Sequence, residues 1–220
     1  MSYSGHPFSH HTGKRFQAKQ LIVHPNFRQR RNPYFTTHKY NSFAFDYCLA
    51  EIDKVDFDAL KTNGKYADVT MLPEKHAPFA IGQPGEKEIS TNCMIVGWGP
   101  TRLNGGQSPV KQEAPIEIMS KSYCQNAANG VSIHGSTLLS KYKKYYERVE
   151  GTYSFCAGKE GSKVDTCPGD SGGPLFCEIN GEWRIIGITS HGPDCGYGHP
   201  GIYAKVAFVL PWIKDNTDCK

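Results

Sequence analysis

The most constraining feature of the sequence is a hairpin signal within residues 175–188. Two apolar segments, residues 176–179 and 183–186, flank the dipeptide Asn180-Gly181. Asn-Gly readily supplies the two positive-φ residues of a type I′ turn, whose twist matches that of paired antiparallel strands. The sequence therefore predicts a β-hairpin here, and the fold must contain antiparallel sheet.

The other periodic segments are also short and strand-like, and Gly, Pro and Asn clusters separate them. The alternation of apolar and polar residues predicts strands at residues 20–24, 45–52, 92–96 and 115–120. Helix is scarce: the best candidate is residues 208–215, with Pro211 tolerable only in the first turn, and a second candidate is residues 138–149. Many short strands with turns between them predict an all-β sandwich or barrel.

The cysteine pattern indicates an oxidising compartment. The chain has eight cysteines and no C-x-x-C pair, which argues against zinc ribbons and redox motifs and favours disulfides in a secreted, extracellular protein. The first seven residues are polar, however, and show no apolar run of a signal peptide. A disulfide-rich body without an export signal leads us to expect that the sequence lacks its natural start.

Charge and hydropathy exclude two classes of partner. The formal net charge of +4 is mild and lacks the concentrated basic face of nucleic-acid-binding proteins. No stretch approaches the roughly 18 apolar residues of a membrane span. We therefore expect neither nucleic acid nor membrane as a partner.

The strongest chemical signal is the string Asp-Thr-Cys-Pro-Gly-Asp-Ser-Gly-Gly-Pro at residues 165–174. Glycines around Ser171 let the backbone bend sharply and approach a substrate closely. Gly169 and Ser171 can aim backbone N–H groups at one point, as an oxyanion hole requires. A bare Ser-Gly-Gly would indicate only a turn before a strand, whereas the full string indicates a nucleophilic serine.

This string resembles the active-site motif of the chymotrypsin/trypsin family of serine proteases. Further segments are similar to the family in order and spacing: Val96–Gly99, Phe155–Gly158, Ser190–Gly192, Pro200–Tyr203 and Pro211–Ile213. The resemblance covers residues 20–220, so the chain is identified as a trypsin-like serine protease that is N-terminally incomplete.

The resemblance implies an all-β, chymotrypsin-like double antiparallel β-barrel with the first barrel incomplete and a short C-terminal helix. We expect one peptidase domain, residues 1–220, with a poorly defined stretch at 1–19, a remnant of the first barrel at 20–90, and the second barrel with the helix at 91–220. An unclosed barrel exposes strand edges and apolar surface, so we expect the chain to fold poorly by itself.

Catalytic roles follow from the same resemblance. Ser171 matches the nucleophile, and Gly169 with Ser171 matches the oxyanion hole. Asp46 matches the triad aspartate, and Asp170 matches the aspartate that pairs with the new N-terminus after activation cleavage.

The resemblance also places a substrate pocket. Asp165, six residues before Ser171, matches the carboxylate at the pocket base, while Ser190, Gly192 and Gly201 match its lining. A buried carboxylate is costly without a cation to pair with, which favours Arg or Lys before the scissile bond.

Three disulfides are implied by the family pattern: Cys93–Cys177, Cys124–Cys156 and Cys167–Cys195. Cys48 and Cys219 are left over. These two either pair with each other or remain free or intermolecular.

Several departures from the family suggest narrow specificity. His191 stands where the family has a tryptophan, so a flat apolar wall is lost. Pro168 replaces a flexible residue at the pocket rim and removes a backbone donor. The loop between Cys124 and Cys156 is longer than is typical and would overhang the cleft.

The family's catalytic histidine, in an Ala-Ala-His-Cys context, has no counterpart. None of the upstream histidines has this setting, and His24 matches a structural residue instead; the set is His6, His10, His11, His24 and His38. Without a histidine base Ser171 stays a weak nucleophile, and losing a triad member costs roughly four to six orders of magnitude in turnover. As written, the chain should have little activity.

Two functions remain. The first is a serine-type endopeptidase that cleaves protein or peptide substrates after Arg or Lys by acyl-enzyme chemistry, without cofactor or metal and subject to protein inhibitors. The alternative is a non-catalytic protease homologue that acts as a binding or regulatory protein. The intact Ser171, Asp46 and Asp165 favour the first, and the missing histidine favours the second.

Overall fold

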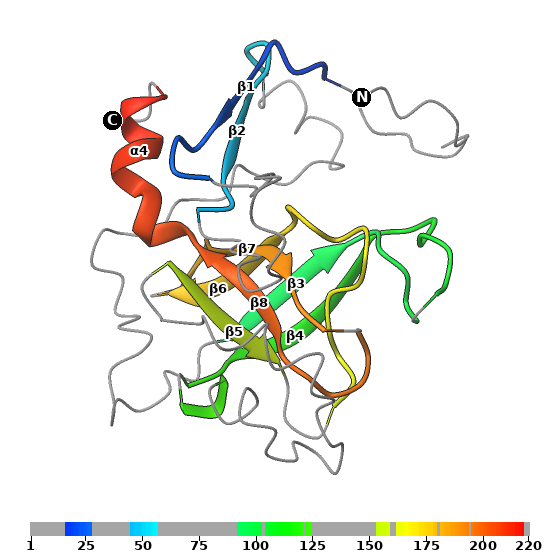
Figure 1. Ribbon diagram of the computed structural model, residues 1–220. Helices are drawn as coiled ribbons and strands as arrows, with labels where there is room; N and C mark the ends of the chain where they lie inside the picture. Colours follow the sequence, from blue (N-terminus) through cyan, green and yellow to red (C-terminus); the bar gives the residue numbers. More distant parts are fainter. Residues whose placement is uncertain are drawn as a thin grey trace, which may run out of the picture.

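The centre of the molecule is a closed, antiparallel β-barrel (Figure 1). This computed structural model describes residues 16–27, 45–56, 92–102, 104–120, 122–124, 153–158, 162–179, 181–193 and 195–217. The barrel strands are β3 Cys93–Gly97, β4 Gln112–Ile118, β5 Ser154–Gly158, β6 Pro174–Ile179, β7 Glu182–His191 and β8 Gly201–Lys205. They close in the order β3-β4-β5-β8-β7-β6. The predicted all-β class and barrel are confirmed.

The hairpin predicted from Asn180-Gly181 is the β6–β7 pair. Ile179 pairs with Glu182, which leaves a two-residue loop, and Gly181 has φ +81°. The pairing then runs back to Pro174 and Ile188, with one irregularity after Leu175. The predicted nucleophile, Ser171, lies just before β6 and is therefore positioned by this hairpin.

Aromatic and aliphatic side chains from opposite strands fill the barrel. Phe155 on β5 and Tyr203 on β8 are fully buried, and their rings stack with centroids 5.7 Å apart. The remaining members of this core cluster are Cys93, Ile95, Ile116, Ala157, Leu175, Cys177 and Ile186. Burying a large apolar side chain contributes roughly 1.5–3 kcal/mol, so this cluster contributes substantially to stability.

A small two-stranded sheet lies beside the C-terminal helix and above the barrel (Figure 1). It pairs β1 Gln20–Val23 with β2 Cys48–Glu51. The second strand is shorter than the predicted residues 45–52. Residues 45–47 form a turn instead, and the Tyr47 side chain contacts the barrel.

The C-terminal segment combines two kinds of helix. A 3₁₀ turn, η1 Val206–Val209, leads into α4 Leu210–Asp215, with Pro211 in the first turn of α4. Proline is tolerated there because the first N–H groups of a helix have no partner within it. The predicted helix at residues 208–215 is thus present, with a 3₁₀ start.

Aromatic rings join the small sheet to the helix. The buried His24 ring lies 4.9 Å from Trp212 and 5.0 Å from Phe45, measured between centroids. The His24 backbone N–H donates to the Tyr47 carbonyl, and its Nδ1 accepts from the Asn26 N–H. Burial lowers the pKa of His24. His24 therefore acts in packing here.

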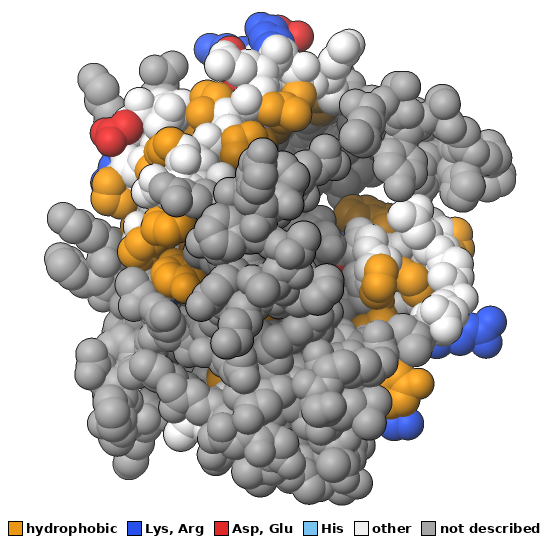
Figure 2. All heavy atoms as spheres, viewed as in Figure 1, with side chains coloured by type: hydrophobic (Ala, Val, Ile, Leu, Met, Phe, Trp, Pro, Cys, Tyr) orange, Lys and Arg blue, Asp and Glu red, His pale blue; other side chains and the backbone are white. Residues whose placement is uncertain are grey.

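The other face of the small sheet carries exposed apolar side chains. Leu21 and Val23 are 64% and 51% exposed, and their cross-strand partners Ala50 and Cys48 are exposed too. Figure 2 shows hydrophobic side chains gathered over this region at the top of the molecule. This exposed face is as apolar as a surface that is normally buried in a protein core.

The structure contains all three disulfides that the family resemblance implies: Cys93–Cys177, Cys124–Cys156 and Cys167–Cys195. Cys48 is a free, exposed cysteine, whereas the sequence had left open a bridge to Cys219. Cys219, the candidate helix at residues 138–149 and most of the long loop after Cys124 lie outside the described residues.

Tyr47 ties the segment before β2 to the barrel. Its buried hydroxyl lies 2.8 Å from the Lys205 carbonyl oxygen and 3.0 Å from that of Tyr153, and it donates to them. Burial raises the pKa of this hydroxyl. Because Asp46 is the preceding residue, the Tyr47 anchor also restrains Asp46, whose carboxylate contacts Ser190 on β7.

We expect Tyr47→Phe to lower the free energy of unfolding by about 0.5–1.5 kcal/mol, because it removes the hydrogen bonds of a buried hydroxyl. Chemical denaturation of the oxidised protein measures this difference. Tyr197→Phe is the matched control, since Tyr197 is 54% exposed and should change stability by less than about 0.5 kcal/mol. Equal stability of the two variants would contradict the anchoring role.

Candidate active site

Two consecutive turns present Ser171 at the surface. The Asp170 N–H donates to the Cys167 carbonyl at 2.9 Å, and the Gly173 N–H donates to the Asp170 carbonyl at 2.8 Å. Gly169 and Gly172 take φ values of +114° and +81°, which glycine adopts without a steric penalty. In the first turn Pro168 precedes Gly169, the arrangement typical of a type II turn. Ser171 is exposed.

The side chain of Asp170 holds these turns against the end of β3. One carboxylate oxygen accepts from the Gly99 N–H at 2.7 Å, and the other accepts from the Cys167 N–H at 2.9 Å. Sterics explain why both Gly97 and Gly99 are glycines: a β-carbon at either position would overlap the Asp170 carboxylate. The Gly97-Trp98-Gly99 segment, which is similar to the family's, thus binds the Asp170 carboxylate.

Asp46 and Ser190 meet although 144 positions separate them. The Ser190 hydroxyl donates to Asp46 Oδ2 at 2.6 Å, the length of a charge-assisted O–H···O⁻ bond. The same hydroxyl oxygen lies 3.0 Å from Nδ1 of His191. Burial lowers the pKa of His191 to about 4. Three side chains therefore form one polar chain that follows Thr189, which bonds to Gly172 and Gly173.

Asp165 lies half-buried where β8 begins. Its Oδ1 accepts the Thr166 N–H at 2.8 Å, and the Gly196 N–H is a further donor. Burial, with the charge of Asp170 as a smaller cause, raises the pKa of Asp165 to about 7. Within the described residues no Lys or Arg forms an ion pair with it.

Two glycines lie close to one another beside Asp165. A β-carbon at Gly201 would lie 3.2 Å from Asp165 Oδ1, and one at Gly192 would lie 3.5 Å from the Gly201 Cα. Gly192 follows β7 and Gly201 opens β8, so the two face each other across neighbouring strands. The predicted pocket residues Asp165, Gly192 and Gly201 are thus brought together.

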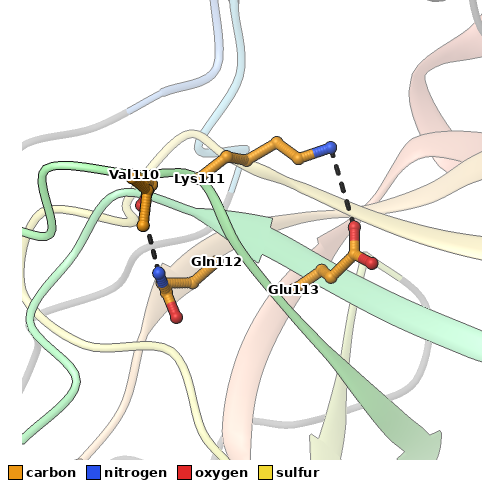
Figure 3. Close-up of polar contacts among 4 residues, drawn as sticks. All are labelled: Val110, Lys111, Gln112 and Glu113. Atoms are coloured by element: carbon orange, nitrogen blue, oxygen red, sulfur yellow. Dashed lines mark hydrogen bonds and ion pairs between the residues drawn. The ribbon is translucent and has the colours of Figure 1, made fainter. Parts of the chain in front are cut away.

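A cavity of about 400 Å³ adjoins both carboxylates. Its inner wall includes Asp165 and Asp170, and its outer wall includes Arg102, Gln112 and Glu113. At the rim, Glu113 pairs with Lys111 at 3.6 Å, and Gln112 Nε2 donates to the Val110 carbonyl at 3.2 Å (Figure 3). Lys163 lines the cavity as well, so side chains of both charge signs surround it.

Sequence reasoning missed two contributors to the site. Thr166 Oγ1 lies 3.3 Å from the buried Tyr203 hydroxyl, which places both beside Asp165 at the pocket base. The second is His191. From the sequence, only its substitution for the family's tryptophan was identified, and its contact with the Ser190 hydroxyl was not predicted. The adjacency of Ser190 and His191 was the available signal.

We expect Gly99→Ala to destabilise the protein by about 1–3 kcal/mol, since overpacking at a filled site costs that much. The new methyl group would push against the Asp170 carboxylate. Thermal unfolding of the variant measures the effect. Gly106→Ala serves as the control, because a β-carbon there meets nothing within 4 Å. If both variants unfold at the same temperature as the wild type, the steric argument is wrong.

Comparison with known proteins agrees with this geometry. The family model described as Trypsin matches residues 2–213. "Transmembrane protease serine 9" of Rattus norvegicus is 33% identical over 141 residues, which are 63% of this chain and 12% of that protein. The chain thus spans a small part of that relative's length.

A solved structure shares the fold. The mouse neuropsin, titled a serine protease expressed in the limbic system of mouse brain, superposes with a TM-score of 0.59 at 26% identity, over 91% of this chain and 71% of that one. No helix among the described residues is both long and apolar enough to cross a membrane. The protein belongs to the trypsin family of serine proteases.

Proposed function

We propose that the protein is a secreted serine endopeptidase that hydrolyses peptide bonds after Arg or Lys. The observation that carries the proposal is the placement of Asp165: a half-buried carboxylate, held by backbone donors alone among the described contacts, that lines a cavity of about 400 Å³. A substrate guanidinium or ammonium group would supply the missing cation, and a guanidinium could do so through two parallel hydrogen bonds.

Ser171 is the nucleophile of the proposed reaction. Its Oγ forms a bond to the substrate carbonyl carbon, and collapse of the tetrahedral intermediate breaks the C–N bond and releases the amine with a proton. Water then hydrolyses the acyl-enzyme. We assign the oxyanion hole to the N–H groups of Gly169 and Ser171, because tandem turns expose this stretch of backbone.

Asp46 serves in this proposal as the carboxylate that orients the base. Its contact with Ser190 and the Tyr47 anchor support a defined position for it. Asp170 is assigned to activation: the cavity beside it has room for an N-terminal ammonium group released by cleavage. Such a cation would pair with a carboxylate that otherwise accepts only backbone N–H groups among the described contacts.

Three disulfides support a secreted location, because such bonds persist in oxidising compartments. The partners are then extracellular protein or peptide substrates and protein inhibitors. The second candidate function, a non-catalytic binding or regulatory homologue, is favoured by one observation: no histidine occurs in an Ala-Ala-His-Cys context.

The expected outcome of a specificity assay is faster hydrolysis of an arginyl peptide amide than of its citrulline analogue. Asp165→Asn should reduce that preference by roughly 30-fold or more, since removing one partner of a buried charge pair costs about 2–5 kcal/mol. Asp215→Asn, at an exposed carboxylate on α4, is the control and should keep the preference.

Ser171→Ala decides between the two functions in the same assay. Loss of turnover in this variant supports the endopeptidase. No turnover by the wild type, or turnover that survives Ser171→Ala, would leave the binding homologue as the better account.

Ligand binding at Asp165 should depend on pH. With a pKa of about 7, the carboxyl is mostly protonated below pH 7 and ionised above it. Only the ionised form attracts a cation, so the affinity for an aromatic amidine should fall about tenfold for each pH unit below 7. Fluorescence titration with p-aminobenzamidine measures this, and Asp165→Asn should remove the dependence. A flat profile in the wild type would contradict the raised pKa.

A further inference from the structure

The small sheet formed by β1 and β2 turns its more apolar face toward solvent. Alternate residues of a strand point to opposite faces of a sheet. On the inner face, Ile22 and Leu49 are paired and half-buried, and Leu49 packs against the cluster of the C-terminal segment. The opposite side, called the outer face below, consists of four exposed residues: Leu21, Val23, Cys48 and Ala50.

A sheet with this pattern requires a second layer. Sheets are stable when each apolar face is buried against another element, and a pair of strands without such a layer is marginal in water. The inner face has its layer in the aromatic and aliphatic side chains of the C-terminal segment. The outer face lies over the top of the molecule, where hydrophobic side chains are accessible (Figure 2). Exposed apolar surface of this kind marks a site of association.

The side chains of the outer face are matched to one another in size. Each cross-strand pair joins a large residue of β1 to a small residue of β2: Leu21 with Ala50, and Val23 with Cys48. The outer face therefore has a ridge along β1 and a groove along β2. Two layers interdigitate when large residues of one lie over small residues of the other, so the ridge of one such face fits the groove of a second.

Charges at one end of the outer face have the same arrangement. Lys19 lies two residues before Leu21, and its backbone N–H extends the pairing by donating to the Glu51 carbonyl. The Lys19 ammonium forms an ion pair with Asp53, which follows β2, and both side chains are exposed. The β1 side of this end is thus positive and the β2 side negative. The outer face is complementary to itself in charge as well as in size.

We propose that the outer face binds the outer face of a second copy of this chain. The two-fold axis runs parallel to the strands, between β1 and β2, and places β1 of each copy over β2 of the other. Large side chains then lie over small ones: Leu21 over the partner's Ala50, and Val23 over the partner's Cys48. The Lys19 ammonium lies beside the partner's Asp53.

This geometry satisfies the general rules for such contacts. An interface that uses the same patch on both copies is closed, so association stops at the dimer. The strands of the two sheets stay nearly aligned, as they do in a β-sandwich. Because β2 directly follows Asp46 and Tyr47, the dimer also restrains the segment that holds Asp46. The association itself does not depend on the chemistry of Ser171.

Sedimentation velocity of the full, oxidised chain over a series of concentrations tests the proposal. We expect a monomer–dimer equilibrium that weakens as salt is added, because salt screens the exposed charges. Val23→Glu should raise the dissociation constant by about tenfold or more, since it places an unpaired carboxylate in an apolar contact. Val110→Glu is the matched control, because Val110 is 61% exposed against 51% for Val23 and lies on the loop before β4.

A charge exchange tests the register. Lys19→Asp gives one variant two negative side chains at this end of the outer face, and Asp53→Lys gives the other variant two positive ones. Each variant alone should dimerise more weakly than the wild type, because like charges face each other. An equimolar mixture should form a heterodimer more readily than either variant forms its homodimer. A mixture no more dimeric than its components overturns the proposed register.

The remaining outcomes also decide. A wild-type chain that stays monomeric, or that forms open-ended aggregates, overturns the proposal and leaves the outer face to a different partner. A dimer that survives Val23→Glu uses another surface. A dimer that is lost in Cys48→Ser depends on a disulfide through Cys48 and contradicts the packing of that residue under the partner's Val23. Circular dichroism and thermal unfolding verify that each variant folds, which we expect because all the substitutions are at exposed side chains.

Discussion

The conformation of the site depends on the hydrogen bonds that hold the Asp170 carboxylate. Its two oxygens accept backbone N–H groups from Gly99, at the end of β3, and from Cys167, which is bridged to Cys195. One side chain thus joins the barrel wall, the disulfide and the turns around Ser171. Without it, the turns around Ser171 would lose the contact that sets their position, since short turns rich in glycine have little conformational preference of their own.

Much of the second barrel could be predicted because its signals are local. The Asn-Gly dipeptide specified the β6–β7 hairpin, and the short strand-like segments at residues 20–24 and 92–96 became β1 and β3 with small shifts. Strand β4 begins at Gln112, before the predicted residue 115. Its polar start has no alternation to mark it, since it is exposed along the cavity rim.

Contacts across long sequence separations could not be predicted in the same way. The bonds from Tyr47 to Lys205 and from Ser190 to Asp46 join residues 158 and 144 positions apart. No local pattern carries such information, because it arises only when β2 and the C-terminal segment pack together. For the same reason the sequence showed Asp46 and His191 as separate features, although Ser190 connects them.

The placement of two carboxylates explains why the site is held by backbone donors. Asp165 and Asp170 line one cavity, and the charge of Asp170 contributes to the raised pKa of Asp165. Like charges disfavour each other's ionised form, whereas N–H donors and cations favour it. A cation beside Asp165 or Asp170 therefore favours the ionised form of Asp165. Asp165 and the turns around Ser171 are thus electrostatically linked through the Asp170 carboxylate, because the charge of Asp170 contributes to the pKa of Asp165.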